Sequence, residues 1–191
     1  MRAAVLLALG GVFLAGSANA DLVGDRASGK RLSLQCRTCH GADGFARIPI
    51  APHIGGEPEA YLRAQLTAFR DGTREHEMMS IVAKSLNDQQ IADLAAWYGG
   101  HSVTVNLPAN PENAPESCAG CHGADGLHLF EDAPNLAGEA NIYIDTQLKA
   151  FRSGKRTHEV MSAIAADLTN EEIRAFADWY AGIEIEISVK E

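Results

Sequence analysis

The sequence predicts an all-α protein made of two tandem copies of one small helical domain, and three observations carry this prediction. The 191-residue chain repeats itself without gaps at a constant offset of 82 positions, so that Cys36 corresponds to Cys118. A match at a fixed period indicates two copies of one structural unit. Within each copy apolar residues recur at helical spacing. Each copy also contains one C-x-x-C-H motif, at Cys36–His40 and at Cys118–His122.

The N-terminus has the pattern of an export signal. Arg2 precedes an apolar run that ends near Ala15, and Ala18-Asn19-Ala20 is a small-x-small cleavage site. We therefore expect a signal peptide at Met1–Ala20, cleavage after Ala20 and a periplasmic location; the alternative is a retained N-terminal anchor. The apolar run is too short for a permanent membrane helix and no later segment is longer, so we expect no transmembrane segment in the mature chain.

The charge of the chain narrows the class of partner. The formal net charge is −9, and cleavage of the signal peptide removes Arg2 and makes it −10. Such a surface repels nucleic acids and anionic membranes, so neither is an expected partner. The negative charge favours a partner with a basic or largely apolar docking surface.

The repeat and the composition divide the chain into five segments. They are the signal peptide (1–20), an N-terminal domain (21–100), a linker (101–117), a C-terminal domain (118–182) and a tail (183–191).

Three helices are expected in the first domain and, by the offset, similar ones in the second. Residues 21–34 favour an amphipathic helix that leads into the first C-x-x-C-H motif. A second helix is expected at 57–70, where Tyr61, Leu62, Leu66 and Phe69 recur at helical spacing. The third, at 87–98, begins at the capping residue Asn87.

Two short segments break the helical pattern. His101–Leu107 and Ile183–Val189 both alternate apolar with polar residues, which is the period of a half-buried strand. A lone strand leaves its backbone groups unpaired, so these two segments could pair with each other. We predict a short antiparallel ribbon at the domain interface; a frayed C-terminal tail is the alternative.

The C-x-x-C-H motif is typical of covalent haem attachment. Two thiols separated by two residues can add to the vinyl groups of one haem, and the adjacent His40 or His122 can coordinate its iron. A redox disulfide and a zinc site built from both pairs are the alternatives, but the first expects a βαβ context that is absent here. We therefore expect two haem c groups, bound through Cys36, Cys39, Cys118 and Cys121.

The second axial ligand should recur at the same offset in both copies. Met79 and Met161 meet this condition, whereas Met78 corresponds to Val160. A methionine opposite a histidine raises the reduction potential of a c-type haem. His76 and His158 also recur, three residues before each methionine, so bis-histidine ligation is the alternative.

Several further residues are expected around the haems. The carbonyls of Pro52 and Pro134 are suitable acceptors for the second N–H of each axial histidine. Four arginines are candidates to bind the propionates: Arg70, Arg74, Arg152 and Arg156. Three histidines without a histidine in the other copy are expected to be ordinary surface residues: His53, His101 and His128.

These motifs resemble the di-haem cytochrome c4 family of class I cytochromes c over nearly all of the mature chain. The resemblance rests on C-x-x-C-H-G-A-D-G in both copies, on Tyr61–Gly72 with Tyr143–Gly154, and on Met79–Leu86 with its copy. It implies two cytochrome c domains related by a pseudo-two-fold axis, with the haem edges facing one another and His/Met ligation. The run Ala46–Pro52 also resembles di-haem cytochromes that partner flavoprotein sulfide dehydrogenases.

The resemblance leaves three functions to compare. The first is a soluble carrier of single electrons between redox partner proteins, with a terminal oxidase or another periplasmic protein as the acceptor. The second is the cytochrome subunit of a flavoprotein oxidoreductase such as sulfide dehydrogenase. The third, a di-haem peroxidase, needs an iron with an open position, which a methionine in register in both copies disfavours. We therefore expect an electron-transfer protein with no catalytic residues of its own.

Overall fold

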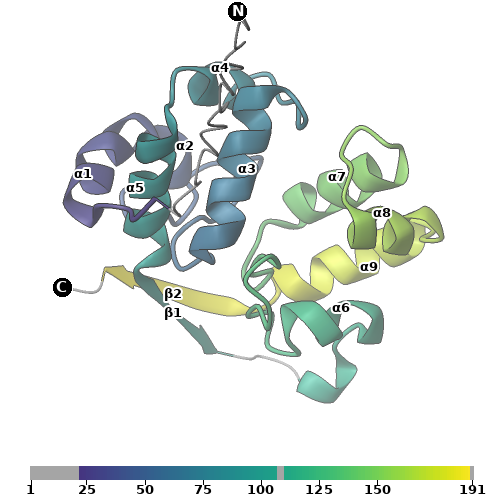
Figure 1. Ribbon diagram of the computed structural model, residues 1–191. Coiled ribbons are helices and arrows are strands. Elements are labelled where there is room, and N and C mark those ends of the chain that lie inside the picture. Colours follow the sequence, from purple (N-terminus) through teal and green to yellow (C-terminus); the bar gives the residue numbers. More distant parts are fainter. Residues whose placement is uncertain (1–21, 107–109, 190–191) are drawn as a thin grey trace, which may run out of the picture.

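The computed structural model describes residues 22–106 and 110–189, and Figure 1 shows two groups of helices joined by a two-stranded ribbon. Three predicted features lie outside the described residues: the signal peptide with its cleavage site, Leu107 of the first predicted strand and the last two residues of the tail. Among the described residues no helix is long and apolar enough to cross a membrane.

The N-terminal domain is built around helix α5. Its elements are α1 (Arg26–Leu32), the 3-10 turn η1 (Ser33–Gln35), α2 (Arg37–His40), α3 (Glu59–Asp71), α4 (Met79–Lys84) and α5 (Asp88–Gly99). Helix α5 packs against both α1 and α3. It begins where the sequence predicts, because the Asn87 side chain accepts from the Gln90 amide and Gln90 binds back to the Asn87 amide.

The first helix is shorter than the sequence predicts. Its N-cap is Asp25, whose carboxylate accepts a hydrogen bond from the amide of Ser28, so the helix begins at Arg26. It ends at Leu32, where the chain tightens into the 3-10 turn that leads to Cys36.

The C-terminal domain repeats this arrangement. After the 3-10 turn η2 (Pro111–Asn113) it consists of α6 (Glu116–His122), α7 (Asn141–Arg152), α8 (Glu159–Ala166) and α9 (Asn170–Ala181). Helix α7 packs against α8 and α9, as α3 packs against α4 and α5. The predicted duplication and the all-α class are therefore confirmed.

Each domain has its own apolar core. In the N-terminal domain the core consists of Leu62, Phe69, Ala83, Leu86, Ile91, Leu94, Ala95, Trp97 and Tyr98. In the C-terminal domain it consists of Ala137, Ile144, Leu148, Ile173, Ala177, Tyr180 and Ile183. Because the two cores are separate, the packing between the domains must come from other residues.

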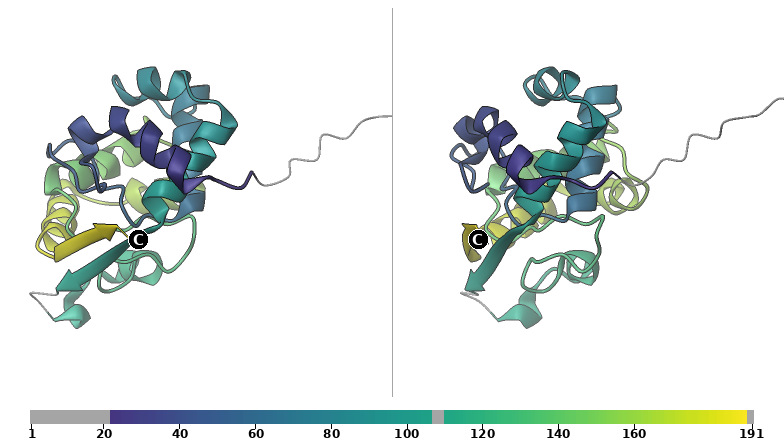
Figure 2. Two further views of the ribbon diagram at one scale, coloured as in Figure 1. Left: turned by 90° about the vertical axis from the view of Figure 1, so that its left-hand side faces the viewer. Right: turned by 60° about the vertical axis from the view of Figure 1, so that its left-hand side comes forward.

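The predicted ribbon is present and joins the domains. Strand β1 (His101–Asn106) follows α5 and pairs antiparallel with β2 (Glu184–Val189), which follows α9. Figure 2 shows β2 returning to lie beside β1, at the end of the N-terminal domain. The alternative prediction of a frayed C-terminal tail is therefore wrong for the described part of this segment.

Two glycines let the ribbon approach the helical domains. Gly56 and Gly138 have positive φ angles of 76° and 70°. A Cβ on Gly56 would meet the side chain of Val103, and one on Gly138 would meet that of Ile185. Strand β1 therefore packs on a loop of the N-terminal domain and β2 on the corresponding loop of the C-terminal domain.

Candidate functional site

The two C-x-x-C-H motifs lie on short helices. Cys36 is the N-cap of α2, and Cys118 lies in α6, so that each pair of cysteines spans less than one helical turn. All four cysteines are free thiols and half-buried. Residues three apart on a helix share one face, so both sulfurs of a pair face the same side. In the described chain neither pair forms a redox disulfide.

Burial keeps the first cysteine of each pair neutral. It raises the pKa of the Cys36 thiol to about 11 and also raises the pKa of Cys118. Binding of zinc by cysteine requires the thiolate, which this apolar environment disfavours. The surroundings fit a thioether bond better than a metal–thiolate site.

The two axial histidine candidates are held in the same way in both domains. His40 and His122 are 7% and 6% exposed. Their Nδ1 atoms lie 2.8 Å from the carbonyl oxygens of Pro52 and Pro134, respectively. A carbonyl only accepts, so each Nδ1 carries the proton and each Nε2 has a free lone pair for a metal. These are the hydrogen bonds that the sequence predicts.

The protonation state of these histidines also suits metal binding. Burial lowers the pKa of His40 and of His122, while the two proline carbonyls act in the opposite direction. The imidazoles are therefore neutral at physiological pH, the form that coordinates iron.

Two methionines lie in matching positions. Met79 is the first residue of α4 and Met161 lies in the first turn of α8; each packs partly buried against the core of its own domain. Met78 is 60% exposed and Val160, its counterpart, is 49% exposed. The structure thus points Met79 and Met161 inward, in the register predicted from the repeat.

His76 and His158, the residues of the bis-histidine alternative, line the same cavity as the two methionines, and each binds the backbone beside its methionine. The Nδ1 atom of His76 accepts from the amide of Met79 at 3.3 Å, and that of His158 accepts from the amide of Met161 at 3.3 Å. His158 is the N-cap of α8, and His76 binds the first amide of α4, so each bond helps to fix the position of the methionine backbone. Because each Nδ1 accepts, each Nε2 carries the proton. The arrangement favours methionine over histidine as the second axial residue.

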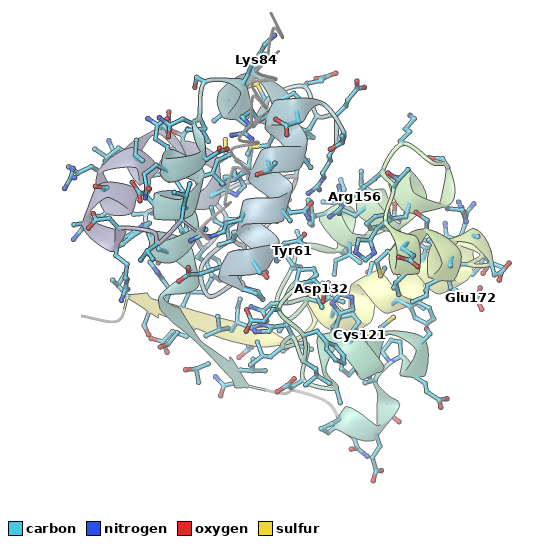
Figure 3. The ribbon with its side chains drawn as sticks, viewed as in Figure 1. Tyr61, Lys84, Cys121, Asp132, Arg156 and Glu172 are labelled. Atoms are coloured by element: carbon cyan, nitrogen blue, oxygen red, sulfur yellow. The ribbon has the colours of Figure 1, made fainter. Side chains whose placement is uncertain are left out.

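One continuous cavity of about 500 Å³ connects the two sets of residues. It is lined by the residues predicted from both motifs: Cys36, Cys39, His40, Met79, Cys118, Cys121, His122 and Met161. Figure 3 places Cys121 on the inner side of the C-terminal domain. The buried hydroxyl of Tyr180 also lines the cavity and has no hydrogen-bond partner among the described residues. An apolar cavity with an unused donor fits haem, whose edge carries acceptor oxygens.

Only two of the four arginines reach this cavity. Arg70 binds Asp71 and Asp88 at 2.9 and 2.6 Å, and Arg152 donates to the Leu168 carbonyl at 2.7 Å. These contacts hold Arg70 and Arg152 outside the cavity, which favours the other two arginines as the residues that bind propionates. Arg74 and Arg156 do line the cavity.

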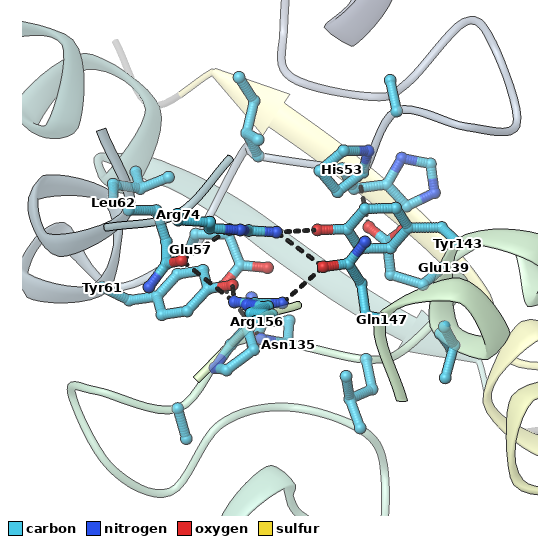
Figure 4. Close-up of a pocket in the computed structure, with 18 of the residues that line it drawn as sticks. His53, Glu57, Tyr61, Leu62, Arg74, Asn135, Glu139, Tyr143, Gln147 and Arg156 are labelled. Atoms are coloured by element: carbon cyan, nitrogen blue, oxygen red, sulfur yellow. Dashed lines mark hydrogen bonds between the residues drawn. The ribbon is translucent and has the colours of Figure 1, made fainter. Parts of the chain in front are cut away.

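Arg74 and Arg156 meet at the boundary between the domains (Figure 4). Arg74 donates to Gln65 at 2.6 Å in its own domain and to Gln147 at 2.8 Å across the interface. Arg156 donates to the same two oxygens, at 3.0 and 2.8 Å. These partners are neutral amides, so both guanidiniums keep their charge available for an anionic group such as a propionate.

Sequence reasoning was wrong about the isolated histidines. His101 is 4% exposed, and its Nδ1 lies 2.8 Å from the Trp97 carbonyl. His53 lies at the interface, where its Nε2 is 3.0 Å from the carbonyl of Gly138. His128 is half-buried and its Nδ1 lies 2.9 Å from Asn135 Oδ1. Each has a polar partner that no local pattern reveals.

Sequence reasoning also missed two buried acids, Glu57 and Glu139. They are 4% and 3% exposed and lie at the domain boundary. The offset of 82 positions relates them to each other, so their recurrence was a signal that could have been used.

Comparisons with known proteins agree with this geometry. Residues 27–98 match the family model described as cytochrome c, and residues 112–179 match that of cytochrome C oxidase, cbb3-type, subunit III. Cytochrome c4 of Pseudomonas aeruginosa is 34% identical over 94% of this chain and 96% of its own. The thiosulfate dehydrogenase electron acceptor of Thiomonas intermedia is 32% identical over 76% of this chain and 77% of its own.

The fold has a solved counterpart. The crystal structure of reduced recombinant cytochrome c4 from Pseudomonas stutzeri superposes with a TM-score of 0.75 at 28% identity, over 85% of this chain and 100% of the other. The structure has two helical domains, each with one attachment motif, and one cavity that both motifs line. The sequence similarity to cytochrome c4 extends over nearly the whole chain. The chain belongs to the cytochrome c4 family and is a di-haem electron-transfer cytochrome with covalently bound haem c.

Proposed function

We propose that this protein acts in the periplasm, where it accepts single electrons from one redox protein and delivers them to another. Its haem irons supply the one-electron chemistry. The observation that carries the proposal is the matched pair of neutral histidines, each with Nδ1 bound to a proline carbonyl and each sharing a cavity with an inward methionine.

The geometry supports the following roles for individual residues. Cys36 and Cys39 attach the first haem and Cys118 and Cys121 the second. His40 and Met79 are the axial ligands in the N-terminal domain, and His122 and Met161 are those in the C-terminal domain. The relation between the domains supports transfer between the two haems, because one cavity is lined by both sets of ligands.

Mass spectrometry of the exported protein tests the attachment and the export. Two haem additions and a mature chain that begins at Asp21 are expected. A Cys121→Ser variant should lose one of the two thioether bonds of the second haem, while Cys36 and Cys39 keep the first haem fully attached. A single haem in the native protein would contradict the assignment of the two motifs.

A second candidate is the electron-accepting subunit of an oxidoreductase. Similarity to an electron acceptor of thiosulfate dehydrogenase supports an enzyme of sulfur-compound oxidation as the electron donor. The resemblance of Ala46–Pro52 to partners of flavoprotein sulfide dehydrogenases supports the same class of donor. Purification from the native periplasm distinguishes the candidates: a subunit co-purifies with its dehydrogenase, whereas a carrier elutes alone.

The negative charge supports a basic docking surface on the partner. Steering between opposite charges is screened by salt, so the rate of electron transfer to a basic partner should fall as ionic strength rises. A rate that rises with salt would identify an acidic partner instead.

A further inference from the structure

A crossed pair of hydrogen bonds connects each buried glutamate to the axial histidine of the other domain. The amide of Asn135 donates to Glu57 Oε2 at 3.0 Å, and the amide of His53 donates to Glu139 Oε1. Asn135 follows Pro134 and His53 follows Pro52. The two contacts are related by the offset of the repeat and both cross the domain boundary.

In each case the glutamate and the histidine bind opposite ends of the same peptide group. The carbonyl of Pro52 and the amide of His53 belong to the same peptide: its oxygen accepts from His40 Nδ1, and its N–H donates to Glu139. The peptide between Pro134 and Asn135 connects His122 with Glu57 in the same way. Hydrogen bonds at the two ends of one peptide polarise each other.

Side chains hold these peptides in place. His53 Nδ1 accepts from the Ala46 amide at 2.8 Å, so its Nε2 carries the proton and donates to the Gly138 carbonyl at 3.0 Å. Asn135, at the corresponding position, donates from Nδ2 to the Gly56 carbonyl at 2.9 Å. Two different side chains thus donate a hydrogen bond to the carbonyl of the glycine before each glutamate. These bonds keep the N–H of each peptide directed toward the carboxyl.

The charge on the carboxyl changes what the histidine offers to the iron. An ionised carboxylate pulls on the peptide N–H, makes the proline oxygen more negative and strengthens its bond to Nδ1–H. A stronger bond makes the imidazole a more basic ligand, which stabilises ferric iron. A protonated carboxyl has the opposite effect and stabilises ferrous iron.

We propose that Glu57 and Glu139 are proton-accepting positioning residues, each of which adjusts the reduction potential of the haem in the opposite domain. When an electron arrives from the redox partner at the iron bound by His40, Glu139 takes up a proton from solvent. Glu57 does the same for the iron bound by His122. One electron and at most one proton enter together, and both leave on oxidation. The inference rests on His40 and His122 as axial ligands.

The surroundings of the two carboxyls suit this role. Burial raises the pKa of Glu139 to about 8 and that of Glu57 well above its usual value, and the two acids repel each other. Glu139 Oε2 has no partner among the described residues, so a proton can reside there. The other charged or titratable groups around them in the cavity are His53, Tyr61, Tyr143, Arg74 and Arg156 (Figure 4).

Four of these groups have a fixed charge near pH 8, which leaves the glutamates as the buried acids that titrate there. Burial raises the pKa of Tyr61 above its usual value and lowers that of His53, so both are neutral near pH 8. The guanidiniums of Arg74 and Arg156 stay charged, because arginine does not lose its proton in proteins.

The test uses the holoprotein and the variants Glu139→Gln, Glu57→Gln and the double variant, with exposed Glu131→Gln as the matched control. Glutamine keeps the volume and the accepting oxygen but cannot ionise. The reduction potential of each haem is followed by spectroelectrochemistry from about pH 5 to about pH 10. Combining each variant with Met161→His or Met79→His lowers one potential and so separates the two haems.

We expect both potentials of the native protein to fall as pH rises; for the haem bound by His40 the fall should be steepest near pH 8, the pKa of Glu139. If one proton accompanied each electron, a tenfold change in proton concentration would shift the potential by about 59 mV. Glu139→Gln should remove the pH dependence of the haem bound by His40, and Glu57→Gln that of the haem bound by His122. Glu131→Gln should change neither profile.

A second readout does not depend on the variants. Reduction of the native holoprotein in weakly buffered solution near pH 8 should take up protons, which an indicator dye records. No uptake by the native protein, or full uptake by the double variant, would overturn the proposal. An effect of each glutamine on the haem of its own domain would also overturn it. Wrong axial ligands would be seen separately, as unchanged haem spectra in the methionine variants.

Discussion

Val103 of β1 lies opposite Ile187 of β2 in the antiparallel ribbon. Ile187 is 8% exposed, and a Cβ on Gly55 of the N-terminal domain would meet its side chain. One of the last described residues of the C-terminal half is therefore buried against the N-terminal half. The ribbon fastens one domain to the other, although each domain has its own core.

Ile187→Ala should weaken this connection. Loss of a buried isoleucine side chain costs about 2 kcal/mol or more of unfolding free energy. Denaturant unfolding of the holoprotein measures the loss, and the exposed neighbour Ser188, changed to alanine, is the control. Deletion of 183–191 should in addition expose the amides of Val103 and Val105 to hydrogen exchange. Unchanged stability and exchange would mean that the ribbon does not hold the domains together.

The axial assignment predicts different effects for two adjacent methionines. Met79→His should abolish the long-wavelength charge-transfer band expected for one methionine-ligated ferric haem and lower the potential of that haem, because a second histidine stabilises ferric iron. Met161→His should do the same for the other haem.

Met78→Leu is the control, since Met78 is 60% exposed. It should leave both the band and the potentials unchanged. Loss of the band in Met78→Leu would show that the register of the ligand is displaced by one residue.

Repetition made the residues that line the cavity in matching positions predictable from the sequence. Met79 stands out from Met78 because only Met79 has a counterpart, and in the structure Met79 packs half-buried against the core whereas Met78 is 60% exposed. The proline carbonyls were predictable for a similar reason, because Pro52 and Pro134 recur at the same distance after each histidine. The ribbon could be predicted because two alternating segments each needed a partner.

The domain interface was not predictable in the same way. Arg70 and Arg74 look equivalent in the sequence, yet only Arg74 reaches the cavity, because Arg70 is drawn to Asp88 on the next helix but one. His53 looked isolated because its counterpart is Asn135, and only the structure shows that both donate to a glycine carbonyl across the interface. Contacts between distant residues of different chemistry leave no periodic signal.

The arginines at the interface should influence the haem potentials. A positive charge beside the cavity favours the reduced haem, whose iron carries less charge. Arg74→Gln and Arg156→Gln should therefore lower the potentials, by an energy on the order of 1 kcal/mol. Spectroelectrochemistry measures the change. Arg70→Gln is the control, because the charge of Arg70 is neutralised outside the cavity by Asp88; an equal shift in this variant would contradict the role of the interface pair.

The buried acid Glu139 should make the stability of the ferric protein depend on pH. Its pKa is raised by burial from 4.5 to about 8 in the folded state, so between these values the folded protein holds a proton that the unfolded chain has lost. Stability therefore falls as pH rises from about 5 to about 8, with a slope of at most about 1.4 kcal/mol per pH unit, and levels off above the folded pKa.

Glu139→Gln should remove this loss of stability at higher pH, because glutamine does not ionise in the folded or the unfolded state. The stability of the variant relative to the native protein should be near its minimum at pH 5 and grow steadily up to pH 8, whereas Glu131→Gln should show no such trend. Urea unfolding of both proteins at several pH values, with the haems kept oxidised, measures the difference. A difference that stays constant over this range would show that Glu139 is ionised in the folded protein, and its proton would then be unavailable for exchange with the haem of the opposite domain.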